Sequence, residues 1–130
     1  MNKKVLIVED DALVAWSMCA VLAQAGLQVV GTAATADEAV RLADKTNPDL
    51  AILDIRIIGQ RDGIETAMLL RQQSGLPVLF VTGEADPATR LRAADAEPVA
   101  YLLKPVSPDR LLQAIAFALQ ANWKGNGAGS

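Results

Sequence analysis

Residues 5–11 read Val-Leu-Ile-Val-Glu-Asp-Asp, four apolar side chains in a row followed at once by three carboxylates. A short continuous apolar run is typical of a strand that helices cover on both faces of a parallel sheet. The abrupt change to acidic residues predicts that this strand ends at Val8. Four further apolar runs follow along the chain, at Leu27–Val30, Leu50–Leu53, Val78–Val81 and Val99–Leu103.

Stretches with helical periodicity separate these runs, and several carry end signals. Helices are expected from Ala12 to Ala25 before Gly26, at the capping-box spacing of Thr35 and Glu38, from Asp62-Gly63 to about Ser74, and after Asp86-Pro87 and Ser107-Pro108. Five alternating strand and helix units predict an α/β fold of the doubly wound, flavodoxin-like (βα)5 type. We expect a five-stranded parallel sheet of order 2-1-3-4-5 with helices on both faces.

Length and composition indicate one globular domain. The chain has 130 residues, 52% of them hydrophobic, which suffices for a core without disulfides or metal. We expect the domain to occupy residues 1–122 and residues 123–130, which are rich in glycine, to form a flexible tail. No apolar run approaches the roughly 20 residues that span a bilayer, so we expect a cytoplasmic protein without membrane contact.

Residue types exclude several classes of site. Cys19 is the only cysteine and the chain has no histidine, so an internal disulfide, a Cys/His zinc site and a histidine-dependent catalytic pair are all impossible. The net charge of -3 argues against nucleic acid as a direct ligand. Any chemistry must use carboxylates, hydroxyls and lysines.

Polar residues gather where the predicted strands end. Glu9 and Asp10 follow the first strand, Asp54 the third, Thr82 the fourth and Lys104 the fifth. The carboxyl ends of parallel strands meet at one edge of a sheet, and the ligand crevice for this strand order lies between strands one and three. We expect the five side chains to face one another there.

These side chains suggest phosphoryl chemistry. Neighbouring carboxylates repel by up to about 4 kcal/mol at 4 Å, so the cluster implies a divalent cation or protonation. Oxygen ligands favour Mg²⁺ over metals that prefer softer ligands. With a cation, a lysine and a hydroxyl beside it, Asp54 is placed to attack a phosphoryl group and form an aspartyl phosphate.

At these residues the sequence resembles the receiver domain of two-component response regulators, from residue 4 to about residue 120. Each matching element is weak alone, but five occur in the right order and on the right strand ends. The elements are Val-Leu-Ile-Val-Glu9-Asp10-Asp11, Ile-Leu-Asp54, Asp62-Gly63-Ile-Glu65, Leu-Phe-Val-Thr82-Gly83 and Tyr101-Leu-Leu-Lys104-Pro105.

The resemblance implies a phosphoacceptor and a metal site. Asp54 is the implied phosphoacceptor, and Mg²⁺ is the implied cofactor. The implied ligands are the side chains of Glu9, Asp10 and Asp54 and the backbone carbonyl of Arg56.

The resemblance also implies a phosphoryl pocket and a switch. Thr82 and Lys104 are implied to bind the phosphoryl oxygens, Gly83 to leave access open, and the Lys104-Pro105 peptide bond to be cis. Thr82 and Tyr101 correspond to the hydroxyl and aromatic ring that move together on phosphorylation. That movement is implied to remodel the surface formed by the fourth helix, the fifth strand and the fifth helix.

Partners follow from the same resemblance. A sensor histidine kinase or a histidine phosphotransfer protein is the implied phosphodonor, and a downstream protein is the implied target. The domain is not expected to be an enzyme beyond assisting its own phosphorylation and dephosphorylation. We expect a stand-alone regulator, monomeric or weakly dimeric on phosphorylation.

Two stretches depart from the family pattern. Ile57-Ile58 replace the usual Met-Pro pair in a loop that is one residue longer, and Ala96-Glu97-Pro98 replace a frequent Gly-Ala-Asp element. Arg56 and Glu84 each lie two residues beyond a site residue, where side chains modulate phosphoryl lifetime in the family. We predict that these two side chains pair across the mouth of the site and shield the aspartyl phosphate.

Some residues have plainer interpretations. Asp11 is interpreted as a helix N-cap, with direct metal contact as the alternative. Tyr101 has the alternative of being a half-buried strand aromatic. Arg71, Arg90 and Arg92 are expected to be exposed charges on the third and fourth helices.

Two other functions remain as alternatives. One is a degenerate receiver that acts only as a phosphorylation-independent binding module. The other is a Mg²⁺-dependent aspartate-nucleophile phosphatase, although Arg56 stands where that class has a second, acid-donating aspartate.

Overall fold

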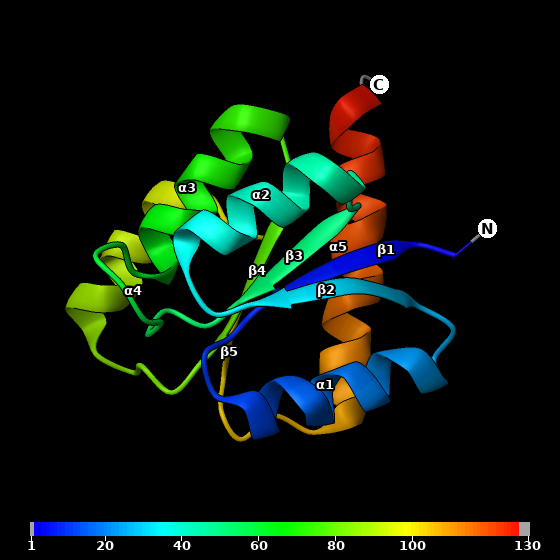
Figure 1. Ribbon diagram of the computed structural model, residues 1–130, viewed down its shortest axis with the longest axis horizontal. Helices are drawn as coiled ribbons and strands as arrows, with labels where there is room; N and C mark the ends of the chain where they lie inside the picture. Colours follow the sequence, from blue (N-terminus) through cyan, green and yellow to red (C-terminus); the bar gives the residue numbers. More distant parts are fainter. Residues whose placement is uncertain (1, 128–130) are drawn as a thin grey trace.

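A computed structural model describes residues 2–127 of the chain, with side chains as far as residue 120 (Figure 1). Five strands form one parallel sheet of order β2-β1-β3-β4-β5, so the predicted fold class and strand order are confirmed. The strands are β1 (Lys4–Val8), β2 (Gln28–Ala33), β3 (Leu50–Leu53), β4 (Val78–Thr82) and β5 (Ala100–Leu103). The helices are α1 (Ala12–Gln24), α2 (Ala36–Thr46), α3 (Gly63–Ser74), α4 (Pro87–Ala93), the 3₁₀ turn η1 (Ala94–Ala96) and α5 (Pro108–Gly127).

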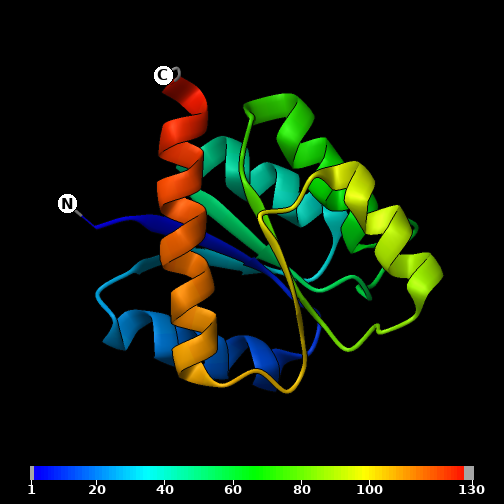
Figure 2. The same ribbon diagram turned by 180° about the vertical axis from the view of Figure 1, so that it is seen from behind.

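The two faces of the sheet have separate cores. Helices α1 and α5 cover one face, and α2, α3 and α4 cover the other (Figures 1 and 2). Side chains alternate along a strand, so Val5 and Ile7 pack with α1 and α5, whereas Leu6 and Val8 pack with α2 and α3. Burial on both faces is the reason why β1 reads as one continuous apolar run.

Polar side chains cap the N-termini of the helices, as expected. Asp11 accepts hydrogen bonds from the backbone N–H groups of Leu13 and Val14, which confirms its interpretation as an N-cap. Thr35 caps α2 through the Glu38 N–H, but the Glu38 carboxylate accepts from the Ala34 N–H, so the reciprocal half of the capping box is displaced by one residue.

The complete capping box lies at α3 instead. Asp62 accepts from the Glu65 N–H, and the Glu65 side chain accepts from the Asp62 N–H, each at 3.0 Å. This reciprocal pair fixes the end of the loop that follows Asp54.

Strand β2 is longer than its apolar run predicts. Strand β2 continues three residues beyond Val30, through Gly31 to Ala33, because backbone pairing with β1 does not need an apolar side chain at each position. Helix α5 continues to Gly127, and residues 128–130 of the predicted tail lie outside the described residues. The domain end at residue 122 stays a prediction.

None of the described helices is both long enough and apolar enough to cross a membrane.

A close backbone approach at Gly63 holds α3 against the end of β3. The Gly63 N–H donates to the Ile55 carbonyl at 2.6 Å, and a Cβ added at Gly63 would lie 1.9 Å from the carbonyl oxygen of Asp54. No rotation of a side chain relieves that clash, because the opposing atoms belong to the backbone. The glycine therefore sets the position of the loop that leaves Asp54.

We expect Gly63→Ala to lower the free energy of unfolding by about 2 kcal/mol, since the backbone on one side must move. Gly83→Ala is the matched control, because a Cβ at Gly83 meets no atom within 4 Å. Urea unfolding of both variants measures the difference. Equal midpoints for the two variants would show that the approach at Gly63 is not tight.

Candidate functional site

Backbone pairing brings the ends of four strands into line. The Asp54 N–H donates to the Val8 carbonyl at 2.9 Å, and the Lys104 N–H donates to the Thr82 carbonyl at 2.9 Å. The first bond places the residue after β3 beside the end of β1, and the second does the same for β5 and β4. Residues far apart in the sequence thus meet at one edge of the sheet.

The Lys104 ammonium joins two buried carboxylates at this edge. Its Nζ donates to Glu9 Oε1 at 2.8 Å and to Asp54 Oδ2 at 2.9 Å. The side chains of Glu9 and Asp54 are 2% and 10% exposed, and that of Lys104 is 26% exposed. Removing one partner from an ion pair with this little solvent contact is costly, because the other charge is then buried without compensation.

Burial and charge act on these groups in opposite directions. Burial raises the pKa of the Glu9 carboxyl, and the nearby Asp54 charge adds to the rise, although hydrogen bonds from Lys104 and the Asp11 N–H oppose it. Burial alone would lower the pKa of Lys104, but its hydrogen bonds to Glu9 and Asp54 outweigh this effect and raise it. Lys104 therefore stays charged at neutral pH, as one cation between two carboxylates.

Glu84 connects the predicted switch residues through its backbone. Its N–H donates to the Thr82 hydroxyl oxygen at 3.3 Å, and its carbonyl accepts from the Tyr101 hydroxyl at 2.6 Å. The Tyr101 ring packs edge-on against Phe80, with a centroid distance of 6.0 Å, and lies 4.4 Å from the Arg90 guanidinium carbon. Tyr101 is thus a partly buried strand aromatic with a specific polar contact to the loop after β4.

The predicted pair across the site mouth is present. The Arg56 guanidinium forms an ion pair with the Glu84 carboxylate. Asp54 Oδ1 accepts from the Arg56 N–H at 3.3 Å, so this pair begins directly beside the Asp54 carboxylate. The role of the pair in phosphoryl lifetime stays a prediction.

A second ion pair lies farther along the same loop. Arg92 of α4 donates to Asp62 Oδ2 at 2.8 Å, and Asp62 is also the N-cap of α3. The two ion pairs line a shallow pocket with Asp10 and Thr89. Together they connect the loop after β3 to the region that begins α4.

The predicted Mg²⁺ ligands are only partly assembled. Glu9 and Asp54 converge on Lys104, whereas Asp10 is exposed on the pocket wall beside Arg56. Within the described part of the chain, no three acidic or cysteine side chains are grouped closely enough to hold a metal ion. The donor set nevertheless fits Mg²⁺ chemically, because every donor is an oxygen and two buried carboxylates share a single ammonium. A complete site requires Asp10 to join the other two.

Other predicted site residues occupy the expected places. Thr82 is buried at the end of β4, Gly83 has open space beside it, and the Lys104-Pro105 peptide bond is cis. The cis bond is as the resemblance implies, and the phosphoryl-binding roles of Thr82 and Lys104 stay predictions.

The arginines expected to be plain exposed charges each have a partner. Arg71 pairs with Glu97 at 3.2 Å, Arg90 stacks on Tyr101, and Arg92 pairs with Asp62. No local spacing in the sequence signals these contacts, because the partners lie on other elements. The close approach of Gly63 to Asp54 is likewise invisible in the sequence, where only the Asp-Gly motif stands out.

Comparison with known proteins identifies the class to which this chain belongs. Residues 5–116 match the response regulator receiver domain family. The chain is 37% identical over 117 residues to the transcriptional regulatory protein PdtaR of Mycobacterium tuberculosis, covering 90% of this chain and 57% of PdtaR. The chain therefore spans a little over half the length of this relative.

Solved structures of receiver domains have the same fold as this chain and match it over nearly its whole length. The signal receiver domain of a modulated diguanylate cyclase from Desulfovibrio desulfuricans superposes with a TM-score of 0.90 at 38% identity, covering 95% of this chain and 98% of that one. A CheY-like response regulator receiver domain protein from Methanospirillum hungatei superposes with a TM-score of 0.87 at 29% identity. The match covers 96% of this chain and 99% of that one.

The chain belongs to the response regulator receiver domain family, which functions in two-component signalling. Receiver domains are usually not enzymes, and they generally bind Mg²⁺ in the phosphorylation site.

The ammonium that Glu9 and Asp54 share predicts how the stability of a Lys104→Met variant depends on pH. The variant is studied in a metal chelator, so that no bound cation replaces the ammonium. Removing the cation leaves two buried carboxylates together, so we expect the free energy of unfolding at pH 7 to fall by about 1–3 kcal/mol. The pKa of Glu9 already lies above its ordinary value of 4.5, and loss of Lys104 raises it further. The folded state then binds protons more readily than the unfolded state, so the lost stability returns as the pH falls toward 4.5.

Chemical denaturation of the wild type and the variant between pH 4.5 and pH 8 measures this effect. Lys3→Met is the control, since Lys3 is exposed and precedes β1. A difference between Lys104→Met and wild type that does not change with pH would contradict the shared-cation interpretation.

Proposed function

We propose that this receiver domain accepts a phosphoryl group on Asp54 from a sensor histidine kinase or a histidine phosphotransfer protein. The single observation that supports this proposal best is the Lys104 ammonium held between the buried carboxylates of Glu9 and Asp54. Such an arrangement presents a carboxylate nucleophile beside a fixed positive charge. The donor and target remain proposals, since the chain spans only part of its relatives.

The contacts of Asp54 indicate how its two oxygens differ. Oδ2 accepts a short hydrogen bond from Lys104, whereas Oδ1 accepts only a long one from the Arg56 N–H. We assign Oδ1 as the attacking atom. Its bond to phosphorus forms as the donor's phosphorus–nitrogen bond breaks, and the electron pair of that bond stays on the imidazole that leaves. The Lys104 ammonium and the Thr82 hydroxyl are placed to stabilise the phosphoryl oxygens.

Glu9, Asp10, Asp54 and the Arg56 carbonyl are the proposed Mg²⁺ ligands. When bound, Mg²⁺ neutralises charge on the phosphoryl oxygens and on the carboxylates. The protein's own contribution is to keep Glu9 and Asp54 close together and buried before the cation arrives. Lys104 compensates one of their two charges in that state.

Glu84 gives the proposed switch a physical connection. Its backbone bonds to both Thr82 and Tyr101, so a rotation of the Thr82 hydroxyl toward a phosphoryl group moves the acceptor of the Glu84 N–H. The Glu84 carbonyl and the Tyr101 hydroxyl are then displaced together, and Arg90 of α4 rests on the same ring. We propose that this movement changes the surface of α4, β5 and α5 for a downstream protein.

The same surface indicates protein rather than nucleic acid as the target. Leu91 of α4 and Leu103 of β5 are 76% and 42% exposed. Arg71, Arg90 and Arg92 each pair within the domain, which leaves them less available for phosphate contacts. We propose a cytoplasmic domain that acts through protein contact, without binding nucleic acid or membrane.

Phosphorylation itself is tested with a small acyl phosphate donor and Mg²⁺. We expect Asp54→Asn and chelation of Mg²⁺ each to abolish incorporation of a hydroxylamine-labile phosphate, because the nucleophile or the cation is missing. The control Asp95→Asn, in the exposed turn η1, should label like the wild type. A wild type that takes no label from this donor or from a phosphohistidine protein would instead indicate the degenerate binding module.

The ion pair across the mouth predicts the lifetime of the product. A partly exposed pair contributes up to about 1 kcal/mol, so we expect Arg56→Ala and Glu84→Ala each to speed hydrolysis of the aspartyl phosphate by up to about fivefold. The double variant should match the single ones, since either change breaks the same contact. Arg61→Ala, an exposed arginine in the same loop, is the control. Unchanged lifetimes in both single variants would remove the shielding role.

A further inference from the structure

The segment 83–92, which runs from the loop after β4 through most of α4, contains no buried residue. Thr82 before it and Ala93 after it are buried. Helices α1, α2 and α3 each bury at least three residues, whereas Ala93 is the one buried residue of α4. Apolar packing therefore does not fix segment 83–92, and polar contacts must hold it in place.

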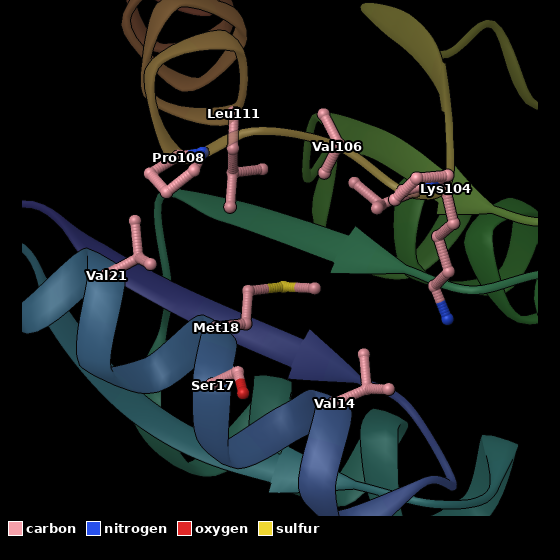
Figure 3. Close-up of a pocket in the computed structure, with 10 residues that line it drawn as sticks. Val14, Ser17, Met18, Val21, Lys104, Val106, Pro108 and Leu111 are labelled. Atoms are coloured by element: carbon pink, nitrogen blue, oxygen red, sulfur yellow. The ribbon is translucent and has the colours of Figure 1, made fainter.

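The loop after the neighbouring strand β5 is held differently. An apolar groove of about 580 Å³ lies between α1 and the start of α5, and Lys104 lies at one end of it (Figure 3). Val106 lines this groove and packs with the core on that side of the sheet, which includes Met18 and Leu111 (Figure 3). Of the two loops beside the site, the one that begins with Lys104 is thus anchored by apolar contacts, whereas segment 83–92 is not.

Arg92 ties the far end of this segment to the start of α3. Its guanidinium donates to Asp62 Oδ2 at 2.8 Å, and the two side chains are 52% and 32% exposed. The other carboxylate oxygen, Oδ1, accepts from the Glu65 N–H and caps α3. The next residue, Gly63, donates its N–H to the carbonyl of the residue that follows Asp54. Arg92 is therefore bound to a point that backbone contacts fix relative to Asp54.

The near end of the segment contains the connection to the switch residues. The backbone of Glu84 bonds to Thr82 and to Tyr101. In the proposed function, the Thr82 hydroxyl turns toward a phosphoryl group and Glu84 is displaced, so the segment has to move. The ion pair of Arg92 with Asp62 lies at the other end of the segment and opposes this movement.

We propose that Arg92 and Asp62 are positioning residues for phosphorylation, whose ion pair holds segment 83–92 in the arrangement of the unphosphorylated domain and so slows phosphoryl transfer to Asp54. This inference rests on the proposed function of Asp54 as the phosphoacceptor. A contact that is stronger in one of two arrangements makes the other harder to reach. By linkage, a phosphoryl group on Asp54 weakens the ion pair in return.

Labelling by a small acyl phosphate with Mg²⁺ tests the effect on phosphorylation. In this reaction Asp54 takes the phosphoryl group as the phosphorus–oxygen bond of the donor breaks, and the electron pair leaves with the donor's carboxylate. Arg92→Met and Asp62→Asn each remove one charge of the pair, and asparagine caps a helix as well as aspartate does. We expect each variant to be labelled up to about fivefold faster, and the double variant to match the single ones.

The signs of the two substitutions separate this effect from simple attraction of the donor. Arg92→Met removes a positive charge and Asp62→Asn removes a negative one. A direct effect on the anionic donor would therefore slow the first variant and speed the second, whereas loss of the ion pair speeds both. Slower labelling of Arg92→Met overturns the proposal.

Hydrogen exchange of the unphosphorylated domain measures the ion pair itself, without any donor. Backbone amides of segment 83–92 should exchange up to about fivefold faster in both variants, because exchange reports the population of the opened segment. The difference from wild type should vanish at about 1 M salt, where the Debye length is roughly 3 Å. Arg92→Lys keeps a cation at this position, so its exchange and labelling should stay close to those of the wild type.

Arg71→Met is the matched control. Arg71 of α3 pairs with Glu97 at 3.2 Å, so this variant breaks an ion pair of the same kind outside segment 83–92. Its labelling, and its exchange within the segment, should equal those of the wild type.

The two measurements fail in different ways. Unchanged exchange in Arg92→Met and Asp62→Asn overturns the claim that the ion pair holds the segment. Faster exchange with unchanged labelling overturns its effect on phosphorylation. A wild type that takes no label at all overturns the proposed function, and with it that effect, while the exchange rates still decide whether the pair holds the segment.

Discussion

The site depends on one ammonium group between two carboxylates. Glu9 and Asp54 are buried side by side, and Lys104 is the cation that makes their proximity tolerable. The three residues come from the ends of three strands, so the interaction exists only if the sheet has its observed order. The two carboxylates share a single ammonium, so the edge of the sheet offers the oxygen donors that a divalent cation prefers.

Contacts around Glu84 join this site to the outer surface. Its side chain pairs with Arg56 beside Asp54, while its backbone bonds to Thr82 and to Tyr101. One residue of the loop after β4 therefore contacts the mouth of the site, the buried hydroxyl and the strand aromatic. Arg92 adds a second connection, from α4 to Asp62 at the start of α3. The loops after β3 and β4 and the helices α3 and α4 are thus joined by these polar contacts.

The two helical layers have different surfaces. Helices α2, α3 and α4 carry charges, and several of these are paired, whereas α1 and the described part of α5 beyond Arg110 present apolar side chains and small residues. The polar layer contacts Tyr101 through Arg90, and the uncharged layer forms the groove that ends at Lys104. The edge of the sheet that carries Asp54 thus lies between a charged surface and an uncharged one.

The sequence by itself determined the fold class and the identity of the residues at the strand ends, because apolar runs, caps and the order of polar residues are local signals. The strand order was predicted correctly, as one of the two common orders for such a fold. It also predicted the pair of Arg56 with Glu84, through the resemblance of positions. Only the tertiary structure decided that Lys104 bridges Glu9 and Asp54 while Asp10 stays exposed, that Gly63 lies against the Asp54 carbonyl, and that Arg92 reaches Asp62. Those contacts join residues distant in the chain, and their geometry depends on how the loops pack rather than on any spacing along the sequence.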